Sequence, residues 1–255
     1  MIVRENQYSF TMIEQHHHGL LAHDIMKKWE GNQVEDDFFF EALMYAIKNH
    51  DKGWRMFDKQ PFWNDAKDSP YTFTNFPTLA KTVLYKQGID EVETENAYAA
   101  LLCSEHYVRF MNNNEQIEAK QFVNDEKKRQ DRIIASLTNF NDDQFLKHYE
   151  LLKFADNLSL YICLNEPGVS KDREHFFFRD GIPAPKFSSI LNEDKIQAHW
   201  QGENIIRLSP FPFSDTFQVT YPAKLISREG IEEIGILETY KKANNFNTEV
   251  ILQEE

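Results

Sequence analysis

Cysteine is scarce in this chain, whose 255 residues include only Cys103 and Cys163. Both lie within apolar patterns of helical spacing, so we expect two buried free thiols, as is typical of a reducing compartment. Long apolar runs are missing as well. The stretch MIVRENQYSF lacks the apolar core of a signal peptide, and no run reaches the length that spans a membrane. The sequence therefore predicts a cytoplasmic protein that has no membrane partner.

Positive charge is also in short supply. The 28 lysines and arginines are outnumbered by 41 aspartates and glutamates, which gives a formal net charge of -13. A surface that follows nucleic-acid phosphates needs clustered basic residues, so we expect no nucleic-acid partner. The sequence also lacks a Walker-type Gly-Lys-Ser/Thr loop, a glycine-rich dinucleotide fingerprint and a Gly-x-Ser-x-Gly elbow. These absences argue against the enzyme classes that depend on those motifs.

Helical patterns dominate the first two thirds of the chain. Apolar residues recur at spacings of three and four from about residue 14 to about residue 165, interrupted by glycines and prolines. The expected helices cover roughly residues 14–30, 35–51, 78–87, 94–111, 115–137 and 142–165, and Gly88 is expected to end the third. The pattern predicts a helical body over residues 1–168, with short strands within residues 2–13.

The pattern changes after residue 170. The segments EHFFFRD, KIQAHWQGENIIRLSPF, FQVTYPAKLIS and TEVILQ are typical of strands, and one helix is expected over about residues 229–243. No low-complexity linker precedes them. We therefore predict a small α+β appendage over residues 169–255 that packs on the body and that the amino-terminal strand could complete. The fold class expected for the whole chain is mainly α.

A long connection follows the second expected helix, over residues 54–77. It contains Pro61, Pro70 and Pro77, and connections of this length are uncommon in compact domains unless they bind or cover a ligand. It is also rich in aromatic side chains: Trp54, Phe57, Phe62, Trp63, Tyr71, Phe73 and Phe76. Two interpretations stay open, because these aromatics could close over a substrate or pack on the core.

Ionisable side chains fall on the buried faces of four expected helices. In a helix, residues at i, i+4, i+7 and i+11 share one face. By this rule His18, His50, His106 and Asp156 each lie on an apolar stripe, and Asp51 follows at the edge of one. A buried histidine bonded to a carbonyl would explain any one of them, but a single cation between the helices accounts for all five. Three imidazoles and two carboxylates suit Fe, Mn, Co, Ni or Zn, so we expect one divalent transition metal per chain.

The order of these residues resembles the HD-domain superfamily of metal-dependent phosphohydrolases. In that superfamily a first histidine, a His-Asp pair and an aspartate on a later helix hold the metal, and the matching residues here are His18, His50, Asp51 and Asp156. More narrowly, Q-x-x-H, HDKGW, LLCSEHY and ADNLSLYIC look like an uncharacterised bacterial domain-of-unknown-function family placed in that superfamily. The resemblance covers most of the chain and implies an HD-type multi-helix bundle.

The resemblance also implies a reaction. A metal-activated water would attack a small phosphoester or nucleotide, with Asp51 holding both metal and water and His106 contacting the scissile group or moving a proton. We expect a small anionic substrate, with Lys52, Trp54 and Arg55 as candidate substrate-binding residues. Many HD hydrolases have a lysine where this chain has Trp54, so the chain departs from the pattern at that position.

Two other functions stay open at this point. Some HD-type proteins use iron to oxygenate small polar substrates, which takes more nitrogen ligands than this pattern provides. The other is a non-catalytic binding or sensor module that a metal stabilises. His148 lies off the stripe of Asp156, so we expect it at the surface. An oligomer is compatible with the sequence.

Overall fold

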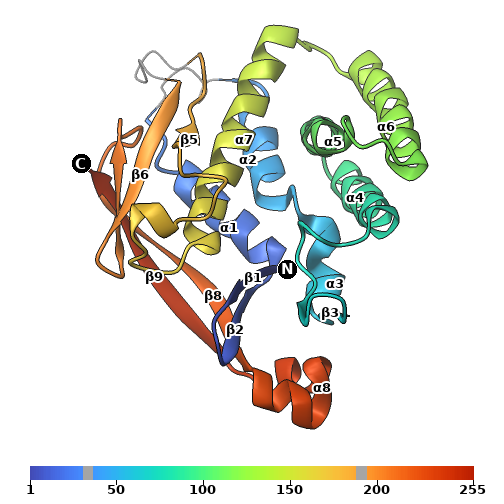
Figure 1. The fold of residues 1–255 in the computed structure, drawn as a ribbon. Coiled ribbons are helices and arrows are strands. Elements are labelled where there is room, and N and C mark those ends of the chain that lie inside the picture. The colour runs from blue at the N-terminus through green and yellow to red at the C-terminus, as the bar shows by residue number, and fades with distance from the viewer. Residues whose placement is uncertain (31–36, 188–193) are drawn as a thin grey trace.

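Seven strands form one sheet in the computed structural model, which describes residues 1–30, 37–187 and 194–255 (Figure 1). The order across the sheet is β1-β2-β8-β9-β7-β6-β5, and β7 with β9 is its one parallel pair. The strands of this sheet are β1 (Ile2–Glu5), β2 (Ser9–Ile13), β5 (Ile182–Pro183), β6 (Lys195–Gln201), β7 (Ile205–Ser209), β8 (Phe217–Ser227) and β9 (Asn245–Glu254). A second, two-stranded sheet consists of β3 (Trp63–Asn64) and β4 (Ser69–Pro70).

The helices lie at different distances from the sheet. Figure 1 shows α1 and α7 next to the strands, α4, α5 and α6 farther away, and α8 at the far end of β8 and β9. The helices are α1 (Gln15–Met26), α2 (Phe40–Asn49), α3 (Arg55–Asp58), α4 (Thr78–Glu93), α5 (Ala97–Met111), α6 (Ile117–Ser136), α7 (Asp142–Leu164) and α8 (Arg228–Lys242), with the short turns η1 (Lys52–Trp54) and η2 (Lys171–Arg173). Within the described residues, no helix is both long and apolar enough to cross a membrane.

The predicted fold class, a mainly α bundle with a small appendage, is wrong, because the sheet is a major part of the structure. Strands β1 and β2 come from the start of the chain and join β8 through antiparallel pairing. One apolar core includes Ile13 of β2, Leu21 of α1, Leu158 of α7 and Leu252 of β9, so helices and sheet share their buried side chains. The chain has an α+β fold. The division after residue 168 stays a prediction.

Most of the predicted elements are present, with shifted ends. Strand patterns at both ends of the chain are confirmed, except that EHFFFRD forms turns instead of a strand. The first helix ends at Met26, earlier than expected. Gly88 does not end a helix, because α4 continues through it to Glu93. The predicted start of the second helix at residue 35 lies outside the described residues.

Two glycines explain why α4 accepts Gly88. A Cβ on Gly53 of η1 would lie 2.1 Å from the carbonyl oxygen of Leu84, and a Cβ on Gly88 would lie 2.6 Å from the backbone nitrogen of Gly53. Only glycine permits so close an approach of two backbones. The contact holds η1 against α4, and η1 directly follows Asp51.

The aromatic side chains of residues 54–77 pack on one another and on the core. Trp54 is only 2% exposed, and its ring lies in edge contact with Phe76 at 5.6 Å and with Tyr85 of α4 at 6.0 Å between ring centroids. Phe57 and Phe62 also contact Phe76. These contacts support the interpretation in which the connection packs on the core.

Candidate metal centre

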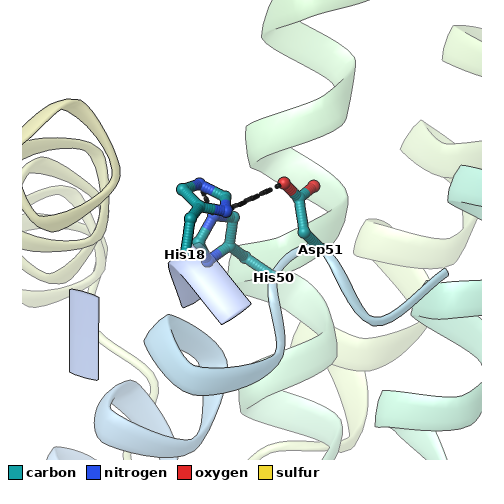
Figure 2. A group of neighbouring side chains, drawn as sticks. All are labelled: His18, His50 and Asp51. Atoms are coloured by element: carbon teal, nitrogen blue, oxygen red, sulfur yellow. Dashed lines mark hydrogen bonds and ion pairs between the residues drawn. The ribbon is translucent and has the colours of Figure 1, made fainter. Parts of the chain in front are cut away.

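Four helices bring the predicted ligands together in the interior. The five residues are His18 of α1, His50 and Asp51 at the end of α2, His106 of α5 and Asp156 of α7. None of them is more than 6% exposed. Figure 2 shows the side chains of His18, His50 and Asp51 pointing toward one another.

Local sequence explains these positions. His18 shares the buried face of α1 with Ala22 and Ile25, which lie four and seven residues later. His50 still has helical backbone angles as the cap of α2, whereas Asp51 leaves the helix with a φ of -105° and a ψ of 22°. Two adjacent residues of the chain can therefore present their side chains to one point.

Three ligand atoms form a tight triangle. Nε2 of His18 lies 3.0 Å from Oδ1 of Asp156, Nε2 of His50 lies 3.3 Å from the same oxygen, and the two nitrogens are 3.3 Å apart. Ligand atoms around one ion lie about 3.0–3.4 Å apart when metal–ligand bonds are about 2.1 Å long. Asp51 lies beside this triangle, because its Oδ2 lies 3.9 Å from Nε2 of His50 and 3.6 Å from Nδ1 of His18, the nitrogen outside the triangle. These buried groups could hold a metal ion.

The backbone sets the orientation of two imidazoles. Nδ1 of His18 lies 2.6 Å from the carbonyl oxygen of Gln15, and Nδ1 of His50 lies 2.8 Å from that of Ile47. A carbonyl oxygen only accepts hydrogen bonds, so each Nδ1 carries the proton and each Nε2 faces the centre. Such outer hydrogen bonds are typical of histidines that bind metals.

The charges of the centre are strongly coupled. Burial lowers the pKa of His50, but its hydrogen bond with Asp156 and the charges of Asp51 and Asp156 outweigh burial and raise that pKa to about 9. Burial raises the pKa of Asp156, yet the hydrogen bonds with His18 and His50 hold that pKa well below its usual range. The metal-free centre therefore carries a proton that a bound cation would displace, because metal ligands must be deprotonated.

Asp51 is held on both carboxylate oxygens by residues that the sequence did not single out for this role. The hydroxyl of Tyr107 lies 2.6 Å from Oδ1 and 2.6 Å from the carbonyl oxygen of His50, and Nε2 of Gln15 donates to Oδ2 over 2.8 Å. Burial raises the pKa of Tyr107 well above its ordinary value, so the hydroxyl keeps its proton. Tyr107 also stacks on Tyr85 at 3.8 Å, which connects Asp51 to the aromatic cluster.

His106 differs from the other two histidines. Its Nε2 lies 3.8 Å from Oδ2 of Asp156, and its buried Nδ1 has no hydrogen-bond partner in the part of the chain that the structure describes. Burial is the main cause that lowers the pKa of His106 to about 4, and the neighbouring His50 lowers it further. His106 is therefore a neutral imidazole whose orientation the backbone does not fix.

Of the three candidate substrate-binding residues, the structure directs Lys52 and Trp54 to contacts outside the centre. Nζ of Lys52 lies 3.8 Å from Oε2 of Glu91, so this side chain points toward α4. Trp54 is enclosed by other aromatic rings. Arg55 is exposed at the start of α3. Burial lowers the pKa of His16 to about 4, and the charge of Arg55 is the second cause of this shift.

The prediction that His148 lies at the surface is wrong. His148 is 1% exposed, its Nδ1 lies 2.8 Å from the hydroxyl of Tyr98, and its Nε2 lies 3.3 Å from Oδ2 of Asp37. The stripe rule failed here because α7 is covered on more than one side, so a residue off one buried stripe falls on another.

The sequence holds a signal for Gln15 and Tyr107 as supporting residues, but not for the side chain that they contact. Gln15 stands in the Q-x-x-H pattern one helical turn before His18, and Tyr107 follows His106 directly. Each is a polar residue beside a predicted ligand, which is the signal expected of a supporting hydrogen bond.

Comparisons with known proteins narrow the identity of the chain to a family. Neither the curated proteins nor the solved structures contain a match to it. A family model, described as protein of unknown function (DUF3891), matches residues 1–228, which include all five residues of the centre. The chain belongs to the DUF3891 family of proteins of unknown function.

Proposed function

We propose that this chain is a metal-dependent phosphohydrolase of the HD type that acts on a small phosphoester or nucleotide. The observation that carries the proposal is the triangle of His18 Nε2, His50 Nε2 and Asp156 Oδ1, with Asp51 beside it. The residues also follow the chain order of the HD superfamily: a histidine, a His-Asp pair and a later aspartate.

The donor set favours one divalent transition metal per chain, which could be Fe, Mn, Co, Ni or Zn. Imidazole nitrogens suit these ions, whereas Ca and Mg prefer oxygen ligands. His50 belongs to both of the ligand groups that the described residues form, one with His18 and Asp51 and the other with His106 and Asp156. Nδ1 of His50 is bonded to the carbonyl oxygen of Ile47, so only Nε2 can bind an ion, and the two groups describe one centre.

Each residue then has a distinct task. A bound metal would lower the pKa of a water ligand and polarise a phosphoryl oxygen. Asp51 would orient the attacking water, since Gln15 and Tyr107 fix its carboxylate. His106 would accept a proton at Nε2, a task that suits a neutral imidazole facing the centre. Arg55, which is exposed, is the basic candidate that remains for attracting an anionic substrate.

The burial of the centre favours a second candidate function. His18 is fully buried, and Asp51, the most accessible of the five residues, is only 6% exposed. An enclosed ion can act as a structural element that stabilises a binding or sensor module, because structural metal sites contribute directly to folding. Turnover of a phosphoester distinguishes the hydrolase from the binding or sensor module.

Elemental analysis of untagged protein tests the shared premise. We expect about one equivalent of transition metal in the wild type and almost none in His50→Ala and Asp51→Ala, because each variant removes a ligand. His199→Ala is the matched control, since His199 lies on β6 and belongs to neither ligand group of the described residues, so its loss should leave the metal content unchanged. A wild type that carries no metal and refuses added Mn²⁺, Fe²⁺ or Zn²⁺ would contradict both candidates.

The metal found in that analysis is then used in a screen of phosphoesters and nucleotides. Phosphate release that disappears in His50→Ala and Asp51→Ala supports the hydrolase. Stoichiometric metal without turnover on the whole panel supports the structural role instead.

A further inference from the structure

The side chain of Gln15 has one satisfied end and one unsatisfied end. Nε2 donates to Oδ2 of Asp51 over 2.8 Å, whereas Oε1 is buried and has no hydrogen-bond partner among the described residues. The opposite orientation of the amide would place Oε1 against a carboxylate oxygen, where two acceptors repel. The contact with Asp51 therefore fixes which end of the amide is free.

An unpartnered carbonyl oxygen in the interior is costly, and such groups in folded proteins are usually explained by a water or an ion. Gln15 is 2% exposed, so bulk solvent does not satisfy it. It lies at the centre itself, because its backbone oxygen accepts from His18 and its amide contacts Asp51. Oε1 belongs to the same amide as the Nε2 that contacts Asp51, so this free oxygen lies beside the centre.

We propose that Oε1 of Gln15 accepts a hydrogen bond from the ligand in the metal centre, so that the centre selects ligands that carry a proton. Water and hydroxyl groups can donate to this oxygen. An aprotic anion such as azide or fluoride cannot donate, and it would face the partial negative charge of the carbonyl. This inference rests on the proposed metal centre.

Tyr107 provides a matched control. Its hydroxyl lies 2.6 Å from Oδ1 of Asp51, so it supports the same carboxylate as Gln15. Unlike Gln15, it has no free buried acceptor, and its protonated hydroxyl also lies 2.6 Å from the backbone oxygen of His50. Tyr107→Phe therefore removes support from Asp51 without changing the acceptor that we assign to the ligand.

The experiment compares azide binding to Co²⁺-loaded protein at fixed pH, followed by the visible absorption of Co²⁺. We expect Gln15→Met to bind azide about two- to tenfold more tightly than wild type, the range that one neutral hydrogen bond is worth. Tyr107→Phe is expected to match the wild type. Competition with a chelator should show Co²⁺ affinity reduced by about tenfold or more in both variants, because both remove an outer hydrogen bond from a ligand.

Each outcome is decisive. Equal azide affinity in wild type, Gln15→Met and Tyr107→Phe would overturn the inference and leave Gln15 with a role only through Asp51. A wild type that binds no Co²⁺ would overturn the metal centre as well, which separates failure of the proposed function from failure of this inference alone. Gln15→Leu, which also lacks an acceptor, repeats the test if the methionine variant does not fold.

Discussion

An Asp156→Ala chain is expected to be less stable than the wild type by about 3–5 kcal/mol in the absence of metal, because two hydrogen bonds between this carboxylate and the buried imidazoles are lost, each worth about 1.5–3 kcal/mol. Oδ1 of Asp156 contacts both His18 and His50, and it is the nearest carboxylate to each Nε2. The raised pKa of His50, about 9, means that this ring is charged at neutral pH. Urea unfolding in the presence of a chelator measures the difference.

The control for this prediction is Asp131→Ala on the exposed side of α6. A surface substitution of this kind changes the free energy of unfolding by about 0.5 kcal/mol or less. If Asp156→Ala and Asp131→Ala unfold at the same urea concentration, the centre does not hold the buried charge that we describe.

Gly53→Ala is expected to lower the free energy of unfolding by about 3 kcal/mol or more, at the upper end of the cost of overpacking. The added methyl group would lie 2.1 Å from the carbonyl oxygen of Leu84. This oxygen belongs to the backbone of α4, so it cannot relieve the overlap by a change of rotamer. Either η1 or α4 has to move. Because η1 directly follows Asp51, we also expect weaker binding of Co²⁺, measured together with urea unfolding.

Gly202→Ala separates steric overlap from backbone strain. Gly202 has a φ of +68°, and a Cβ added to it would meet no atom within 4 Å. The left-handed conformation alone costs about 1–2 kcal/mol, and the turn at Gly202 should leave Co²⁺ affinity unchanged. A Gly53→Ala chain that is as stable as Gly202→Ala and binds Co²⁺ equally well would contradict the close contact between η1 and α4.

The burial of the candidate ligands could be predicted from sequence because helical spacing is a local property. His18, His106 and Asp156 each fall on the apolar stripe of one helix, and the spacing rule finds such positions without knowing how the helices pack. The hydrogen bonds that orient the centre were harder to predict. Whether Gln15 or Tyr107 reaches Asp51 depends on how α1 and α5 pack around the end of α2, which no local pattern contains.

The predicted fold class was wrong because, unlike helical spacing, the pairing of strands is not a local property. The longer strands were recognised, but the pairing of β2 with β8 joins Phe10 to Ile226, and a linear pattern carries no information about pairing over that distance. Gly88 illustrates a second difficulty. A glycine within a helix pattern commonly marks a helix end, yet here it is needed inside α4 to admit the backbone of Gly53.

The place of β9 has a consequence for the order of events during synthesis. β9 is the last strand of the sheet to leave the ribosome, yet it lies between β8 and β7. Until it arrives, β1-β2-β8 and β7-β6-β5 are two separate groups of strands, each with an unpaired inner edge that could join another chain. A chain in which β8 has formed but β9 has not yet joined the sheet therefore has two unpaired edges, and the insertion of β9 pairs both at once.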